Sequence, residues 1–313
     1  MRTLKGFNKD PNATCLENIF LALIYYMDPE NLSHIYSYCW DFGYLEKGKS
    51  ELGLSERLSN TKDRTIQQRL LKQYHGISIR WSENYIPMKI MPEEFPYIVC
   101  MDSFCCSWNI AYQSAHIPHY FFLKKKEGDY FIYDDPYFNL SDQVLSIKDL
   151  KQGLIRTGKA SKKPFLEFNP LKEFINSVKY VIEGYQGKGD CHQIELFAEE
   201  IKNDNDLQQY LIRETDLPAN SKILITLNHI ARGRLKYYMY WNNYADNDAI
   251  CSLIKELRDI YAMWNVTVKL LIRLFFDKNE KNIRKSIYEQ LIAIANAEKK
   301  AGLETLGKCN LLF

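Results

Sequence analysis

The sequence lacks an apolar run of the about 18 residues that a membrane span would need. Its first residues, MRTLKGFNKDPNAT, have no apolar core of the kind found in a secretory signal peptide. The formal net charge is only +2, so the overall charge favours neither nucleic acid nor a membrane surface as a partner. No internal repeat or low-complexity segment is present. These absences predict a globular protein of the cytoplasm.

Spacings typical of disulfide frameworks and metal sites are missing too. The eight cysteines stand at irregular intervals and are expected to be reduced thiols. Cys105 and Cys106, followed by His116 and His119, do not form the separated cysteine pair of a structural zinc site. GYLEKGKS at 43–50 formally matches the phosphate-loop pattern, but its bulky interior favours a charged surface loop. The sequence therefore predicts no metal and no bound cofactor.

The sequence does contain enough apolar and aromatic residues for two domains. It has 313 residues, of which 46% are hydrophobic, with 22 tyrosines and 16 phenylalanines. Residues 1–158 mix helix and strand signals, including a short buried-strand pattern, YIVCMDSF, at 97–104. The basic stretch RTGKASKKP at 156–164 contains Gly, Ser and a closing Pro, and this composition predicts a linker.

Residues 165–313 carry apolar side chains at helical spacing and predict a second, all-α domain. The clearest apolar stripes cover residues 171–185, 253–275 and 283–294. ARGRLKYYMYW at 231–241 combines three basic residues with four aromatic ones. Nucleic-acid binding is one interpretation, but a helix with a basic outer face and an aromatic inner face is favoured. Such a basic face could also dock an acidic carrier protein.

The candidate nucleophile is a cysteine at the start of the first predicted helix, TCLENIFLALIYYM. Thr14 and Glu17 match the T-x-x-E capping box, which puts Cys15 at the first helical position. Unpaired amide N–H groups and the positive end of the helix dipole favour a thiolate there. The same N–H groups could stabilise an oxyanion, and Asn12 is a candidate side-chain donor. A cysteine that only fills space in the core is the alternative.

A two-stranded hairpin is predicted at 119–136, HYFFLKKKEGDYFIYDDP. The charged turn in its middle would bring His119, at one outer end, next to Asp134 and Asp135 at the other. A histidine oriented by an aspartate can take the proton of a nucleophilic thiol. The sequence therefore predicts a catalytic triad that consists of Cys15, His119 and one of the two aspartates.

The length of the hairpin loop decides which aspartate shares a face with His119, because side chains alternate along a strand. A loop of two or four residues would select Asp134, and a loop of three or five would select Asp135. The residues alone leave both alternatives open. His116 is a second imidazole nearby, and it is predicted to lie in a loop near the substrate entrance.

The motifs TCLENIF, HIPHYFF and YDDP resemble the bacteriocin-processing cysteine peptidase superfamily, and they are most similar to its butirosin-biosynthesis acyltransferase-like branch. The resemblance implies an α+β protein, in which a papain-like cysteine protease fold is followed by an all-α domain that completes the cleft. It favours Asp135, directly before the proline, as the partner of His119 and Cys15, with Asp134 as the alternative. Lys9 stands where the peptidase branch has an oxyanion-hole glutamine, so the oxyanion donor is open.

The resemblance also implies a function in nonribosomal peptide or antibiotic biosynthesis. Such relatives take an acyl group from the phosphopantetheine thioester of an acyl or peptidyl carrier protein and pass it to an amine. Amide-forming enzymes of polythioamide assembly are similar in this acyl transfer to an amine. The implied acceptor is a small amine or diamine, with no cofactor beyond the carrier's phosphopantetheine arm. A cysteine peptidase or amidase of the same fold is the alternative, and a non-catalytic binding protein is a third class.

Overall fold

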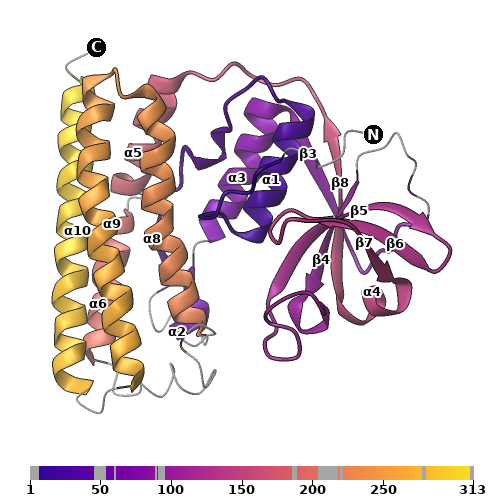
Figure 1. Cartoon of the computed structure of the whole chain (residues 1–313). Helices are drawn as coiled ribbons and strands as arrows, with labels where there is room; N and C mark the ends of the chain where they lie inside the picture. The colour runs from indigo at the N-terminus through magenta and orange to yellow at the C-terminus, as the bar shows by residue number, and fades with distance from the viewer. Residues whose placement is uncertain are drawn as a thin grey trace. The chain divides into compact units, whose positions relative to one another are not determined.

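The protein divides into two compact units, one built on a β-sheet and one made mainly of helices (Figure 1). The first unit joins residues 1–35 to 68–167, and the second joins 36–67 to 168–313. This division differs from the expected 1–158 and 165–313, because the segment 36–67 belongs to the helical unit. The structure, a computed structural model, describes residues 7–45, 54–59, 61–88, 90, 96–184, 189–203, 218, 221–276 and 280–310.

Within the described residues, the first unit contains a six-stranded antiparallel sheet with the order β3-β8-β4-β5-β6-β7. The strands are β3 (Ile77–Glu83), β4 (Tyr97–Asp102), β5 (Pro118–Glu127), β6 (Tyr130–Asp135), β7 (Leu140–Ser146) and β8 (Leu154–Lys162). The predicted strand at 97–104 and the predicted hairpin at 119–136 are confirmed by β4 and by β5–β6.

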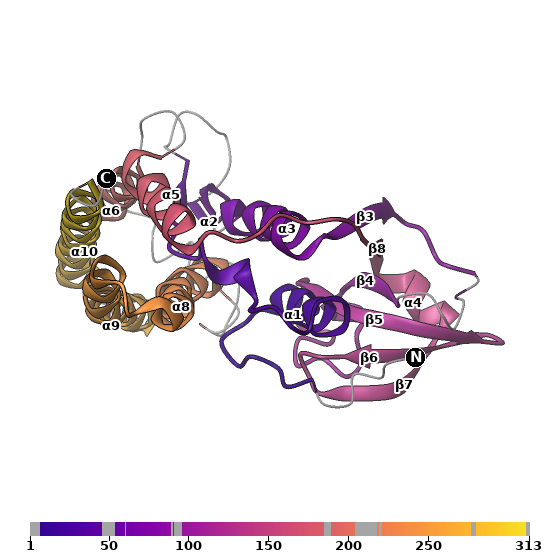
Figure 2. The same cartoon turned by 90° about the horizontal axis from the view of Figure 1, so that it is seen from above.

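Helices cover the sheet of the first unit. Figure 2 shows α1 (Cys15–Met27) running alongside β5. The other helical elements are η1 (His34–Tyr36), α3 (Thr61–His75), η2 (Ser103–Cys105) and α4 (Ile147–Gly153). The unit boundaries cross two of them, because Tyr36 of η1 and residues 61–67 of α3 are grouped with the second unit. α4 buries Leu150 in a core with Val99, Phe121 and Phe131, which come from three adjacent strands. This core supports the ends of β5 and β6, where the candidate site lies.

The interpretation of residues 156–164 as a linker is wrong, because β8 runs through them in the middle of the sheet. Lys159 and Ser161 are exposed, whereas Thr157 and Ala160 are buried. A Cβ atom on Gly158 would approach the Trp81 ring to 2.8 Å. Glycine is therefore needed here because there is no space for a side chain, and not because the backbone must be flexible. The basic, small-residue composition therefore reflects a strand whose polar side chains alternate with buried ones.

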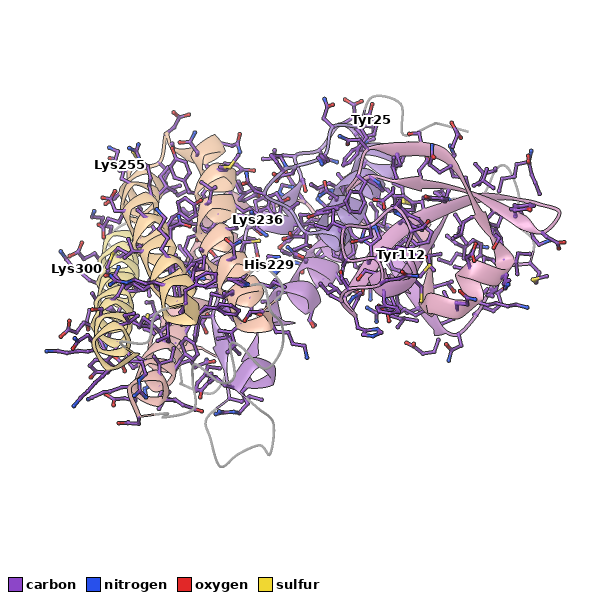
Figure 3. The ribbon with its side chains drawn as sticks, turned by 60° about the horizontal axis from the view of Figure 1, so that its bottom comes forward. Tyr25, Tyr112, His229, Lys236, Lys255 and Lys300 are labelled. Atoms are coloured by element: carbon purple, nitrogen blue, oxygen red, sulfur yellow. The ribbon has the colours of Figure 1, made fainter. Side chains whose placement is uncertain are left out.

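The second unit is a bundle of long helices. They are α5 (Pro170–Glu183), α6 (Asp190–Asn203), α8 (Lys222–Trp241), α9 (Asp248–Phe276) and α10 (Glu280–Asn310), with the short η4 (Asn242–Tyr244). The helices predicted from the apolar stripes are confirmed by α5, α9 and α10. In Figure 3 the exposed side chains of Lys255 and Lys300 point away from the bundle.

The expectation of a purely α-helical second domain needs correction. The segment 36–67 adds to this unit a short antiparallel pair, β1 (Gly43–Tyr44) with β2 (Leu58–Ser59), and the single-turn helix α2 (Leu54–Arg57). Tyr44 packs edge-on against Phe197 of α6, at 5.4 Å between ring centroids. The phosphate-loop-like motif begins in β1, but its residues 46–50 lie outside the described part of the chain.

The basic outer face predicted for residues 231–241 is wrong for two of its three cations. Arg234 is 0% exposed, and its Nε donates to Glu298 Oε1 at 2.9 Å. Trp40 and Trp264 donate their indole N–H groups to the same carboxylate, at 2.9 and 2.8 Å. Lys236 is also buried. A distant carboxylate compensates the charge of Arg234, which the pattern of one helix cannot reveal.

Among the described residues, no helix combines the length and apolarity required to cross a bilayer.

Candidate active site

The N-terminus of α1 holds Cys15 at the first helical position, as predicted. Thr14 Oγ1 accepts from the backbone N–H of Glu17 at 3.2 Å, and Glu17 Oε2 accepts from the N–H of Thr14 at 2.6 Å. The buried side chain of Asn18 holds the preceding loop: its Oδ1 accepts from Asp10 N–H at 3.0 Å, and its Nδ2 donates to Thr14 O at 3.2 Å. The position of the thiol is therefore fixed by local hydrogen bonds on both sides of it.

β5 brings His119 next to this thiol. The Cys15 Sγ lies 3.8 Å from the carbonyl oxygen of Pro118, the residue directly before His119. The thiol is also close enough to the imidazole of His119 to be one of the causes that raise the pKa of that ring. His119 is 3% exposed, so its ring is held among neighbouring side chains. Two segments that lie more than a hundred residues apart in the sequence thus converge at this point.

Asp135 is the aspartate that contacts His119. Its Oδ2 lies 2.6 Å from Nε2 of the imidazole and also accepts from Trp108 Nε1 at 2.9 Å. Its Oδ1 accepts from the backbone N–H groups of Tyr137 at 3.0 Å and Phe138 at 3.2 Å. The carboxylate is 0% exposed, and these donors satisfy it as an anion. Since Asp135 uses Nε2, the other ring nitrogen, Nδ1, remains for Cys15.

Asp134 serves a different purpose. Its Oδ1 accepts from Lys124 Nζ at 3.1 Å and from the backbone N–H of Asp142 at 2.8 Å. Lys124 Nζ also donates to Asp142 Oδ1 at 2.6 Å. Asp134 is therefore part of an ion-pair cluster that joins β5, β6 and β7, and it does not share the role that the alternative triad assigned to it.

A β-bulge selects between the two aspartates. The strands pair from Glu127 with Tyr130, which leaves a two-residue loop that alone would put Asp134 on the face of His119. The register then shifts between Leu123 and Lys125, where Lys124 is an extra residue in β5. One extra residue reverses the alternation beyond it, so Asp135 faces His119 instead.

The electrostatic environment of His119 favours its charged form. Burial lowers the pKa of His119, but the hydrogen bonds and negative charge of Asp135 and Cys15 outweigh burial and raise that pKa to about 9. The raised pKa favours the protonated ring at neutral pH. In general, a cation beside a cysteine favours the thiolate, which is the nucleophilic form of that residue.

Aromatic side chains enclose the imidazole. The ring of His119 lies 5.4 Å from the Phe138 ring, 6.1 Å from Tyr137 and 6.3 Å from Phe121, measured between centroids. Lys9 Nζ donates to the carbonyl oxygen of Tyr137 at 2.9 Å. Lys9 thus connects the segment before α1 to the turn that follows Asp135.

The oxyanion donor stays a prediction. Asn12 lies in the loop before α1, where its backbone N–H donates to Asp10 Oδ1 at 2.8 Å. The first backbone N–H groups of α1 remain the alternative, because a helix start presents amides that have no intrahelical acceptor.

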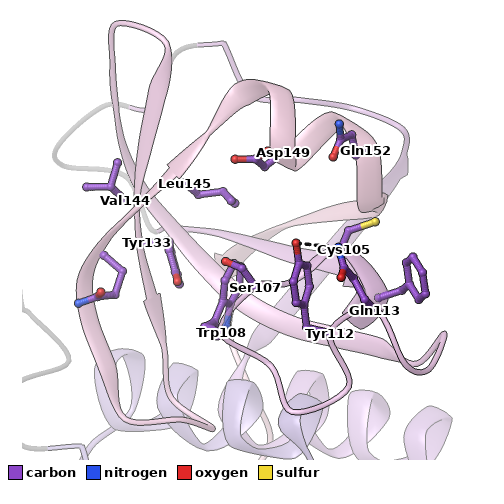
Figure 4. Close-up of a pocket in the computed structure, with 12 residues that line it drawn as sticks. Cys105, Ser107, Trp108, Tyr112, Gln113, Tyr133, Val144, Leu145, Asp149 and Gln152 are labelled. Atoms are coloured by element: carbon purple, nitrogen blue, oxygen red, sulfur yellow. Dashed lines mark hydrogen bonds between the residues drawn. The ribbon is translucent and has the colours of Figure 1, made fainter.

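A cavity of about 530 Å³ lies in the same unit, on the side of the sheet that α4 covers (Figure 4). Its volume is typical of a small-molecule site. Trp108 connects it to the candidate site, because its indole lines the cavity and donates to Asp135. The lining residues are Phe104, Cys105, Ser107, Trp108, Tyr112, Gln113, Tyr133, Gln143, Val144, Leu145, Asp149 and Gln152.

Sequence reasoning did not identify Trp108 as part of the site. Trp108 lies in the loop between β4 and β5, and no local pattern marks it as a partner of Asp135.

His116, in contrast, lies in the predicted loop. The side chain of His116 is 73% exposed, and its Nδ1 lies 2.7 Å from Asp102 Oδ2. The remaining candidate metal ligands, Cys105 and Cys106, are free thiols. Among the described residues, no three His, Cys, Asp or Glu side chains are grouped to hold a metal ion.

No protein-family model and no curated protein sequence matches this chain. The chemistry of the site is therefore inferred from the arrangement of Cys15, His119 and Asp135.

Proposed function

We propose that the protein is a cysteine-dependent acyltransferase whose first unit is a papain-like domain. It would move an acyl group from the phosphopantetheine thioester of a carrier protein to an amine and so form an amide. The observation that carries this proposal is the buried His119–Asp135 pair next to the thiol of Cys15 at the start of α1. A nucleophile, a base and a group that orients the base are the requirements of covalent acyl transfer.

In the first step the Cys15 thiolate attacks the carbonyl carbon of the donor thioester. Backbone N–H groups at the start of α1 would stabilise the resulting oxyanion. The bond between the carbonyl carbon and the pantetheine sulfur then breaks, and His119 gives its proton to the leaving thiolate. The acyl-enzyme is itself a thioester, so this step is nearly balanced in free energy.

In the second step the nitrogen of the amine attacks the acyl-enzyme. The bond to Cys15 Sγ breaks, the thiolate re-forms, and His119 regains a proton from the attacking nitrogen. The amide is more stable than the thioester it replaces, which draws the whole reaction forward. If water replaces the amine, the same residues perform hydrolysis, which is the peptidase or amidase alternative.

The experiment supplies the protein with an acyl-pantetheine thioester and a set of primary amines, with and without a carrier protein as donor. Mass spectrometry of the products distinguishes amide from free acid. Amide formation that is lost in Cys15→Ala and retained in Cys105→Ala supports the proposal. Free acid as the only product would support the hydrolase, and no product at all would contradict both.

A further inference from the structure

The proposed reaction leaves one proton without an acceptor in the triad. A primary amine enters water at neutral pH as an ammonium ion, and its nitrogen loses two protons when it becomes an amide. His119 has given its proton to the leaving pantetheine thiol, so it can accept one proton and restore the pair with the Cys15 thiolate. The other proton must leave the nitrogen before attack, because an ammonium has no lone pair. This inference rests on the proposed function.

Besides the buried pairs His119–Asp135 and His75–Asp28, the first unit contains an exposed imidazole–carboxylate pair. His116 Nδ1 lies 2.7 Å from Asp102 Oδ2, and the His116 ring stacks on Phe104 with 4.5 Å between centroids and 11° between planes. Because Nδ1 is bonded to Asp102, Nε2 is the nitrogen available to another molecule. The side chain of His116 is 73% exposed, so a proton on Nε2 can pass to water.

This pair lies at the same end of the sheet as the candidate nucleophile. Asp102 is the register partner of Pro118, and the neighbouring Met101 is that of His119. Directly paired residues have Cα atoms about 5 Å apart. Cys15 Sγ contacts the carbonyl oxygen of Pro118. Asp102 and Cys15 are therefore both neighbours of Pro118.

The loop that carries His116 is anchored on both sides. Ser103 donates its backbone N–H to Ile117 O at 2.9 Å, and its hydroxyl donates to Ala115 O at 3.0 Å. The N–H of Ile117 in turn donates to Ser103 Oγ at 3.1 Å. These bonds bracket His116, and the stacking on Phe104 fixes the plane of its ring.

We propose that His116, oriented by Asp102, is the base that takes the first proton from the incoming amine substrate, a primary ammonium. The N–H bond of the ammonium breaks, an Nε2–H bond forms on His116, and this proton passes to water. The freed lone pair then attacks the acyl carbon, the carbon–sulfur bond to Cys15 breaks, and His119 takes the second proton. Asp102 also supplies a negative charge that attracts the cationic substrate.

The test compares two nucleophiles at pH 7 in a single turnover of preformed acyl-enzyme. A primary alkylamine arrives as an ammonium and needs the first deprotonation, whereas hydroxylamine is uncharged at this pH and does not. His116→Gln is expected to slow amide formation with the alkylamine about 100-fold and to leave the hydroxylamine rate near that of the unchanged protein. In His116→Ala, added imidazole is expected to restore much of the alkylamine rate, because the vacated position is open to solvent.

His192→Gln is the matched control, because His192 is an exposed histidine 3.5 Å from Glu195 on α6. It is expected to change neither rate. Equal slowing of both nucleophiles by His116→Gln, or slowing of neither, would overturn the assignment of His116. Absence of an acyl group on Cys15 in the unchanged protein would instead overturn the proposed function, and this inference with it.

Discussion

His119 Nε2 and Asp135 Oδ2 lie 2.6 Å apart because Lys124 adds one residue to the strand between them. Without that bulge the two-residue loop of the hairpin would put Asp134 on the face of His119. The identity of the triad acid therefore depends on a local irregularity of the sheet rather than on loop length alone.

Exchanging each aspartate for asparagine tests this selection. Asp135→Asn removes the anion that orients and charges His119, and turnover is expected to fall about 100-fold or more. Asp134→Asn weakens the contact with Lys124, so it is expected to lower the unfolding temperature while turnover stays close to normal. Steady-state kinetics and thermal unfolding of both variants provide the measurement. Equal losses of turnover would contradict the assignment of Asp135.

The raised pKa of His119 predicts a dependence of stability on pH. The folded-state value is about 9 and the ordinary value is 6.5, so protonation of this ring stabilises the folded state fully below about pH 6.5. The contribution decreases as the pH rises and is lost as it passes about 9. The free energy of unfolding, measured for the unchanged protein relative to His119→Gln, is expected to fall across this window. A difference that is independent of pH between 6.5 and 9 would contradict the imidazolium.

The reactivity of the cysteines offers an independent comparison. Cys15 and Cys105 are both partly exposed free thiols, but burial and the charge of Asp102 raise the pKa of Cys105. Burial also raises the pKa of Cys100, Cys106 and Cys191. Iodoacetamide at pH 7 is therefore expected to alkylate Cys15 before Cys105, as followed by peptide mass spectrometry. Faster labelling of Cys105 would remove the support for an activated thiol at the helix start.

The second unit offers a prediction on stability. Glu298 is buried and forms the ion pair with Arg234, so Glu298→Gln removes the carboxylate bonded to a buried cation and is expected to cost about 3 to 5 kcal/mol. Glu304→Gln is the matched control on the same helix, since Glu304 forms an exposed pair with Lys300 at 3.8 Å. Loss of such a surface pair is expected to cost less than about 1 kcal/mol. Denaturant unfolding measures both, and similar costs would contradict a structural role for the Arg234–Glu298 pair.

Local features of the site were predictable from the sequence because each depends on neighbouring residues. The capping box fixed the start of α1 and the position of Cys15. The alternation and turn at 119–136 identified the hairpin, and the i, i+3, i+4 stripes identified long helices. Hydrogen bonds within four residues and side-chain periodicity determine these elements, so short windows of sequence suffice.

Features that depend on distant partners were not predictable. The bulge at Lys124 has no sequence signature, and the donation from Trp108 to Asp135 depends on how a separate loop folds over the sheet. The segment 36–67 belongs to the helical unit because Trp40 packs against Tyr237 and Phe42 against Trp264, each at 5.7 Å between centroids. Such long-range contacts leave no periodic trace in the sequence of either segment.

The most direct test of the central claim is the mass of the intact protein after incubation with an acyl-pantetheine thioester and no amine. The account predicts an increase equal to one acyl group, located on Cys15 by peptide mapping. The increase is expected to persist in Cys105→Ala and to be absent in Cys15→Ala. Amide formation from the same donor by Cys15→Ala at the unchanged rate would contradict covalent catalysis by Cys15.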